Sequence, residues 1–194
     1  AANLPRCLRA LRGCAEIVVV ADGSTDASPR IAAEGGARVV VHPFASFADQ
    51  RNWAMDAAGL RHDLVLHLDA DEVVTPELLA ELRRRLPALE AGAVGQLARK
   101  VMLGDQWLKH SADYPVYVPR LVHRRGPRYA MRGHGETLEV VPAASVYFAE
   151  PLLHYNFSKG WAEWRARHLR YAAAEAARIR SGGTSFSLRK LTSR

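Results

Sequence analysis

Two apolar runs in the first half of the chain each lead directly into a cluster of acidic side chains. Ile17 to Val20 is followed by Asp22-Gly23-Ser24-Thr25-Asp26, and Leu64 to Leu68 is followed by Asp69-Ala70-Asp71-Glu72. Short, mainly apolar runs of this kind are typical of strands that are buried on both faces of a sheet. Because ligands bind at the carboxyl ends of strands in open α/β sheets, both acidic clusters are predicted to lie at a ligand site.

The first half of the chain alternates these strands with helical patterns, which predicts βα units in an α/β fold with a mainly parallel sheet flanked by helices. The helices are predicted over residues 3–11, 28–34, 47–58 and 75–86, and the strands over 17–20, 38–41 and 64–68. From residue 93 onward the pattern predicts strands without regular intervening helices, over 95–103, 118–123, 138–141 and 146–148, and then a last helix over 161–179. We expect the later strands to add antiparallel neighbours to one side of the sheet.

The composition is typical of one soluble globular domain, because 48% of the 194 residues are hydrophobic and 24% are charged. Cys7 and Cys14 are the only cysteines, which favours a reducing compartment such as the cytoplasm. No run approaches the roughly 20 apolar residues that span a bilayer, and the start of the sequence lacks a signal-peptide pattern. We therefore expect this chain to be neither inserted into a membrane nor exported.

The formal net charge of +7 is compatible with nucleic acid, an anionic membrane surface or a phosphate-bearing small molecule as a partner. No zinc-finger or RNA-recognition motif accompanies the arginines, so nucleic acid is not expected.

The acidic cluster after residue 68 has two interpretations. Asp69 and Asp71 are alternate residues whose carboxylates can converge on one centre, and such hard oxygen ligands suit Mg²⁺ or Mn²⁺. Alternatively, Asp71 and Glu72 only favour the dipole of the helix predicted after Thr75. We favour the metal, because a carboxylate that emerges from an apolar strand is costly unless something pairs with it. The earlier loop from Asp22 to Asp26 suits either a polar ligand or an ordinary turn.

Several stretches, taken together and in this order, carry a family resemblance. They are Asn3-Leu4-Pro5-Arg6-Cys7-Leu8, residues 16–26, Gln50-Arg51-Asn52, Leu68-Asp69-Ala70-Asp71-Glu72, Leu103-Gly104, Tyr114-Pro115, Arg120-Leu121, His134-Gly135-Glu136 and Leu153-His154-Tyr155. On these residues the chain resembles family 2 glycosyltransferases of the GT-A fold, and it is most similar to the branch that includes bacterial lipopolysaccharide-core glucosyltransferases.

The resemblance implies a single domain over residues 1–194, with a nucleotide-sugar-binding half at about 1–92, an acceptor half at about 93–160, and a C-terminal helix and basic tail at about 161–194. It assigns Asp69 and Asp71 to a motif that binds the metal and the diphosphate, with Asp71 as the direct ligand. It places Asp22 near the nucleoside, and Arg51 resembles the arginine that helps to hold the nucleotide. The implied cofactor is a divalent cation, Mg²⁺ or Mn²⁺.

Members of the resembled family are inverting enzymes, which implies a general base on the acceptor hydroxyl. Glu136 is the first candidate for this base and Asp113 is the second, although Glu136 also fits a surface turn before a strand. His154 is assigned to the donor site or the metal by analogy alone, and its position after Leu152 and Leu153 suits a core histidine better.

Two features depart from the family pattern. The family begins with a strand before the position of Asn3, and it has an acid where this chain has Ala21. These departures keep open a non-catalytic nucleotide-sugar-binding or scaffold module. A nucleotide- or methyl-transferring Rossmann protein is disfavoured, because no GxGxxG or P-loop motif follows a strand.

The implied partners are a nucleotide-sugar donor and a glycan or lipid-linked acceptor, in the synthesis of cell-envelope polysaccharide or lipopolysaccharide. The C-terminal segment adds an anionic membrane surface, because cations and tryptophans suit lipid headgroups. These residues are Trp161, Trp164, Arg165, Arg167, Arg170, Arg178, Arg180, Arg189, Lys190 and Arg194. We accordingly expect a cytoplasmic protein with peripheral attachment to the inner face of a bacterial plasma membrane. Alternatively, the tryptophans pack on the sheet and the arginines are solvated.

Overall fold

The structure is a computed structural model that describes residues 2–110, 114–133 and 135–181. Its helices are α1 (Leu4–Ala10), α2 (Ser28–Glu34), α3 (Phe47–Ala57), α4 (Pro76–Arg85), the 3-10 turn η1 (Leu86–Ala88) and α5 (Trp161–Ser181). Its strands are β1 (Val18–Ala21), β2 (Arg38–Val41), β3 (Leu64–Leu66), β4 (Glu72–Val74), β5 (Ala93–Leu103), β6 (Gln106–Trp107), β7 (Val116–His123), β8 (Tyr129–Arg132), β9 (Gly135–Leu138), β10 (Ala144–Tyr147) and β11 (Leu152–His154).

The main sheet has the strand order β3-β7-β5-β11-β4, with β10 and β6 also paired to β5. Strand β5 is parallel to β10 and β11 and antiparallel to β6 and β7, and the pairs β3–β7 and β11–β4 are antiparallel. The expectation of a mainly parallel sheet is therefore not confirmed, because this sheet is mixed. Antiparallel neighbours such as β5 and β7 can be joined by short connections, whereas the parallel neighbours β5 and β11 are joined through the intervening strands β6 to β10.

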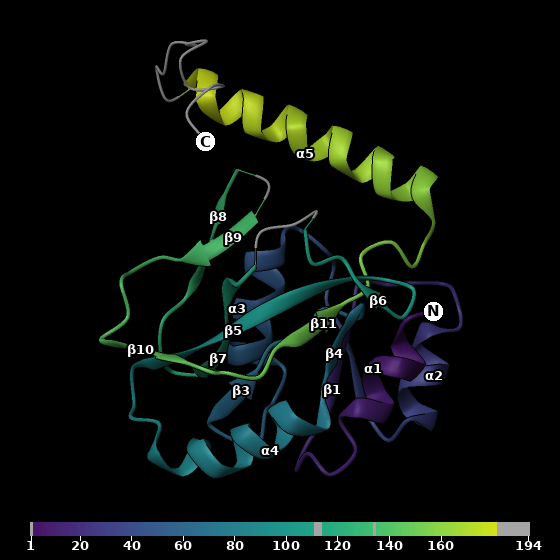
Figure 1. The fold of residues 1–194 in the computed structure, drawn as a ribbon. Helices are drawn as coiled ribbons and strands as arrows, with labels where there is room; N and C mark the ends of the chain where they lie inside the picture. The colour runs from purple at the N-terminus through teal and green to yellow at the C-terminus, as the bar shows by residue number, and fades with distance from the viewer. Residues whose placement is uncertain (1, 111–113, 134, 182–194) are drawn as a thin grey trace.

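Helices flank this sheet in a mixed α/β arrangement that fits a GT-A type fold (Figure 1). Helix α4 begins where the sequence predicts it, with the Thr75 hydroxyl accepting from the Leu78 amide and Pro76 in the first turn. Its residues Leu78 and Leu82 are buried in a core that also contains Leu97. This packing fixes α4 against the sheet next to the acidic turn.

Strands β1 and β3 are half-buried, although their apolar runs predict burial on both faces. Within the described ranges, β1 pairs only with β2 and β3 pairs only with β7. Residues 17–21 and 64–68 line a common opening between these two strands. Each strand thus leaves one edge facing an apolar slot that continues into the cleft described below.

The second half differs most from the sequence prediction. The predicted strand over 138–141 is wrong, because β9 ends at Leu138 and forms a hairpin with β8. Gly133 lies in the hairpin turn with a φ of +64°, and a Cβ atom there would collide with the Glu175 side chain. Helix α5 therefore lies against the tip of this hairpin, as Figure 1 shows.

Candidate active site

A cavity of about 1570 Å³ includes the slot between β1 and β3, opens as a cleft at the carboxyl ends of these strands and extends to α5. Six residues that the sequence singles out line it together: Asp22, Arg51, Asp69, Asp71, Glu136 and His154. Asp113, the second candidate base, lies outside the described residues. Side chains from the turn after β1, from α3, from the turn after β3, from β9 and from β11 thus meet in one cavity.

Two arginines and two carboxylates form the centre of the site. Arg51 donates from Nη2 to Asp69 Oδ1 at 2.8 Å and from Nε to Glu136 Oε1 at 2.7 Å. Arg120 donates from Nη2 to Asp69 Oδ2 at 2.7 Å and from Nη1 to Glu136 Oε1 at 2.8 Å. Both oxygens of Asp69 and one oxygen of Glu136 are therefore held by guanidinium groups, a strong and geometrically specific type of hydrogen bond.

Glu72 adds a third carboxylate beneath this centre. Its side chain is fully buried, accepts from Arg120 Nη2 at 2.7 Å, and accepts from the Asp69 backbone amide at 3.0 Å. The suggestion that Glu72 serves a helix dipole is not supported by these contacts, because Glu72 begins β4 and faces Arg120. Three carboxylates against two guanidinium groups leave the cluster with one excess negative charge if all are ionised.

Burial and charge act on the cluster in opposite directions. Removal from water would raise the pKa of Asp69, but the charges of Arg120 and Arg51 outweigh this and hold that pKa below its usual value. Burial raises the pKa of Glu72, and the neighbouring charge of Asp69 raises it further. Asp69 is therefore the ionised partner of the arginines, and Glu72 takes up a proton at a higher pH than Asp69 does.

Asn52, next to Arg51 on α3, fixes the hairpin that carries Glu136. The Asn52 side chain donates to the Tyr129 carbonyl oxygen at 2.9 Å and accepts from the Tyr129 amide at 3.0 Å. The buried Tyr129 side chain lies against His67 and beneath the Arg51 guanidinium. The Gln50-Arg51-Asn52 stretch thus positions both the site arginine and the strand pair β8–β9.

Asp71 and His154 face the cleft as a separate pair. Asp71 Oδ2 lies 3.6 Å from His154 Nε2, and their side chains are 19% and 15% exposed. The Tyr155 amide donates to the Asp71 carbonyl oxygen at 2.8 Å, which ties the acidic turn to the end of β11. His154 is therefore not a core histidine bonded only to backbone groups.

Asp71 and His154 are the side chains of the cleft with capacity for a divalent cation. Among the residues that the structure describes, no group of three or more His, Cys, Asp or Glu side chains is placed to hold a metal ion. Both oxygens of Asp69 are already occupied by arginines, whereas Asp71 and His154 have no other side-chain partner in the described ranges. Mg²⁺ takes one or two carboxylates and completes its shell with water and substrate phosphates, so the Asp71–His154 pair fits such an ion.

The end of the cleft near β1 is aromatic as well as acidic. Asp22 follows β1 and accepts a hydrogen bond from the Ser24 hydroxyl. Phe44 and Phe47 line the same end, their rings edge to face with centroids 5.3 Å apart, and they are 51% and 42% exposed. Sequence reasoning missed these two phenylalanines, although a pair of aromatics between a strand and a helix could have indicated them.

Sequence reasoning also missed the roles of Arg120 and Glu72. Arg120 is 3% exposed and lies within the predicted strand 118–123, where an arginine requires a buried anionic partner. That mismatch between residue type and predicted burial is the signal that could have identified the cluster.

Comparisons with known proteins identify relatives of this chain. A family model described as glycosyl transferase family 2 matches residues 1–154, a range that includes all six residues above. A TPR repeat-containing protein from Synechococcus elongatus is 39% identical over 104 residues, which cover 53% of this chain and 25% of that protein. Uncharacterised glycosyltransferases from Rickettsia bellii and Rickettsia felis are 35% and 32% identical over 83 residues, 42% of this chain. These two matches cover 28% and 29% of the rickettsial proteins, so the chain spans less than a third of each of these relatives.

Proposed function

The chain belongs to glycosyl transferase family 2, and we propose that it is an inverting hexosyltransferase that moves a sugar from a nucleotide-sugar donor to an acceptor hydroxyl. The observation that carries the proposal is the convergence of Asp22, Arg51, Asp69, Asp71, Glu136 and His154 on one cleft within the matched range.

The donor is proposed to lie along the cleft from β1 towards β11. Asp22 would bond the nucleoside, and the exposed rings of Phe44 and Phe47 offer a face for the base, since every base has a stacking surface. Asp71 and His154 would hold a divalent cation, Mg²⁺ or Mn²⁺, whose charge neutralises the leaving diphosphate when it is bound. Asp69 would act through the arginines, because both of its oxygens accept from them.

Glu136 is the proposed general base. Its Oε1 accepts from both arginines, whereas its Oε2 is buried and has no hydrogen-bond partner within the described ranges. The guanidinium groups thus orient the carboxylate, and Oε2 is the atom available to accept the proton of an acceptor hydroxyl. Asp113 stays the alternative base.

A non-catalytic nucleotide-sugar-binding module is the second candidate, and a specific observation favours it. Ala21, at the position where the resembled family has an acid, is 8% exposed at the end of β1 and offers no polar group to a base. Transfer and binding assays distinguish the two: a panel of nucleotide sugars is tested for release of the nucleoside diphosphate with Mn²⁺ and with a chelator. Metal-dependent binding without any release or transfer would overturn the enzymatic proposal.

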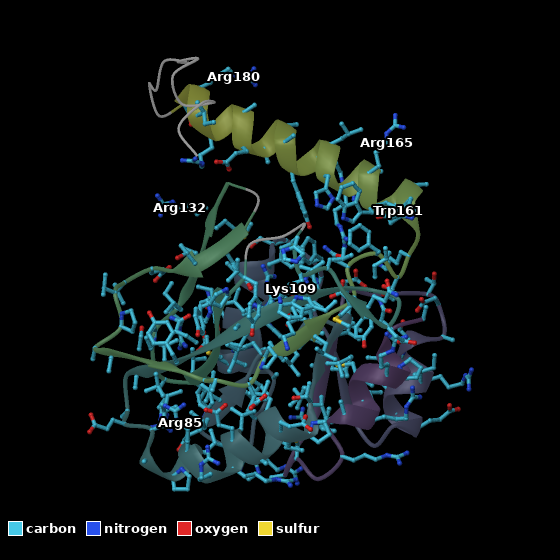
Figure 2. All side chains as sticks on the ribbon, in the orientation of Figure 1. Arg85, Lys109, Arg132, Trp161, Arg165 and Arg180 are labelled. Atoms are coloured by element: carbon cyan, nitrogen blue, oxygen red, sulfur yellow. The ribbon has the colours of Figure 1, made fainter. Side chains whose placement is uncertain are left out.

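The acceptor is proposed to be a glycan or a lipid-linked glycan of the bacterial cell envelope, as in lipopolysaccharide synthesis, met at an anionic membrane surface. Helix α5 supports this location, because Arg165 and Arg180 project from the side that faces away from the sheet, as Figure 2 shows. Trp164 stacks on His168 of α5 and on Phe157 in the connection that precedes α5. No helix in the described part of the chain is long and apolar enough to cross a bilayer.

A further inference from the structure

Three basic side chains line the end of the cleft formed by β5, β11 and α5. They are Arg99 on β5, Lys159 in the connection between β11 and α5, and Arg167 on α5. None of the three has an acidic partner within the described ranges, whereas Arg51 and Arg120 at the centre of the same cleft are both paired with carboxylates. This end of the cleft thus has positive charge that no acidic side chain of the described ranges compensates.

Arg99 projects into the cleft from its sheet floor. In the parallel β5–β11 pair, Arg99 is opposite Leu152, and Val101 is opposite His154. Because these two register pairs are two positions apart along the strands, Arg99 and His154 lie on the same face of the sheet. The Nε atom of Arg99 is buried and has no hydrogen-bond partner within the described ranges. A buried donor without a partner costs free energy, so this arginine favours binding of an acceptor group from a ligand.

Arg167 faces the same space from α5. Its Nη2 donates to the Asn156 carbonyl oxygen at 2.6 Å, which orients the guanidinium towards the end of β11. Its Nε and the Oδ1 atom of Asn156 are buried and have no hydrogen-bond partner among the residues that the structure describes. The cleft therefore has an arginine on the sheet side and an arginine on the helix side, with the exposed Lys159 between these elements.

We infer that Arg99, Arg167 and Lys159 form a binding subsite for a phosphate group of a substrate. Guanidinium groups bind phosphate oxygens with two parallel hydrogen bonds, and the unpartnered Nε atoms supply such donors. The phosphate comes either from the diphosphate of the donor or from a phosphate on the acceptor. Only this assignment to a substrate rests on the proposed function, because the unpaired charges are a property of the cleft itself.

The test uses inorganic pyrophosphate as the probe, in the presence of a chelator so that bound metal cannot contribute. Binding is measured by calorimetry for the wild-type chain, Arg99→Gln and Arg167→Gln. Each substitution should weaken pyrophosphate binding about tenfold, because it removes charged hydrogen bonds to the anion. Arg84→Gln is the matched control, since Arg84 is an exposed arginine on α4 that does not line the cleft. Arg167 lies on the exposed helix α5, so its variant keeps the test valid if Arg99→Gln reduces the folded fraction.

A second titration distinguishes the two sources of the phosphate. If the variants also lose affinity for nucleoside diphosphates, the subsite holds the donor. If the variants bind nucleoside diphosphates like wild type but no longer bind pyrophosphate when a nucleoside diphosphate is present, the subsite holds a phosphate of the acceptor. The inference is overturned if wild type binds no pyrophosphate, if both cleft variants bind it like wild type, or if Arg84→Gln weakens it equally. These titrations measure binding and not sugar transfer, so a negative result overturns the phosphate subsite without affecting the proposed transferase activity. A failed transfer assay would likewise not affect the phosphate subsite.

Discussion

Arg120 is the residue on which the charge arrangement of the site depends most. It is 3% exposed and contacts Asp69, Glu72 and Glu136. Removing one partner of a buried ion pair typically costs about 3–5 kcal/mol, because the other charge stays buried without compensation. We therefore predict that Arg120→Met lowers the unfolding free energy by about 3–5 kcal/mol at pH 7.

The loss in Arg120→Met should be smaller at pH 5 than at pH 7. Burial and Asp69 already raise the pKa of Glu72, and without Arg120 that pKa rises further, so the folded variant takes up protons that the unfolded chain does not. A carboxyl group whose pKa is higher in the folded chain than in the unfolded chain stabilises the fold at pH values below the unfolded-state pKa. This stabilisation is lost as the pH rises through the folded-state pKa. Urea unfolding at the two pH values measures this, and an equal loss at both would contradict the buried-charge explanation.

Asp71 should be dispensable for folding but essential for the stabilisation of the nucleoside diphosphate complex by a divalent cation. The ion-pair partner of its side chain within the described ranges is His154, at 3.6 Å. In a thermal-shift panel of nucleoside diphosphates, Mn²⁺ should raise the melting temperature of the wild-type complex above that with chelator, and Asp71→Ala should abolish this difference. Asp63→Ala is the matched control, because Asp63 is an exposed acid outside the cleft. A metal effect that persists in Asp71→Ala would remove Asp71 from the metal site.

Glu136→Gln should separate binding from chemistry. The amide oxygen can still accept from Arg51 and Arg120, so nucleoside diphosphate affinity should stay near the wild-type value. Transfer should fall by roughly 10²–10⁴-fold, because an amide cannot accept the proton of the acceptor hydroxyl. Initial rates together with calorimetry check both parts. Near-normal turnover would exclude Glu136 as the base and direct the search to Asp113.

At the scale of elements, local signals predicted the first half of the chain well. Helix α2 and strand β2 have the predicted bounds, Ser28–Glu34 and Arg38–Val41, because turn glycines and a β-branched run delimit them. Strands β4, β8 and β11 were not predicted. Each has three or four residues; β4 and β11 are held by partners far away in sequence, and β8 pairs with β9 in a hairpin. Such short segments carry no periodicity of their own.

The candidate site, like the fold, could be predicted from the sequence only in part. The acidic turn with Asp69 and Asp71 follows directly from a strand and its end, and this could be predicted from sequence. The pairing of Asp69 with Arg120 joins residues that are 51 positions apart, and only the β3–β7 register brings them together. Arg51 shows the same limit: a helical arginine is usually exposed, yet this one is 7% exposed because Asp69 and Glu136 compensate its charge.

The β8–β9 hairpin should depend on Asn52. Replacement by Ala leaves the amide and the carbonyl oxygen of Tyr129 without their partners, which should cost about 1–3 kcal/mol of stability. Hydrogen exchange should speed up in residues 129–138, whereas α4 on the other side of the sheet should exchange as before. Transfer should also fall, because Glu136 lies on β9. Unchanged exchange in the hairpin would show that α5 and the sheet hold it without Asn52.

At the scale of the whole molecule, α5 connects the cleft to the outer surface. Its residues Arg167, His168 and Tyr171 line the cleft, whereas Arg165 and Arg180 project away from the sheet (Figure 2). The family match ends at residue 154, so α5 lies outside it. A helix that lines one end of the cleft and carries basic residues on its outer face would suit the proposed delivery of a membrane-borne acceptor to that cleft.

The last prediction tests this arrangement with vesicles. The wild-type chain should sediment with anionic vesicles and not with neutral ones at low salt, because each cation near an anionic surface contributes about 1 kcal/mol. The double variant Arg165→Gln/Arg180→Gln should bind roughly thirtyfold less tightly, which corresponds to about 2 kcal/mol. The double variant Arg9→Gln/Arg12→Gln removes the same charge from exposed positions near α1 and should bind like wild type. Binding should weaken as salt rises, since the screening length falls from about 10 Å at 0.1 M to about 3 Å at 1 M. Equal losses in the two double variants would show that net charge, and not the outer face of α5, attracts the chain to the membrane.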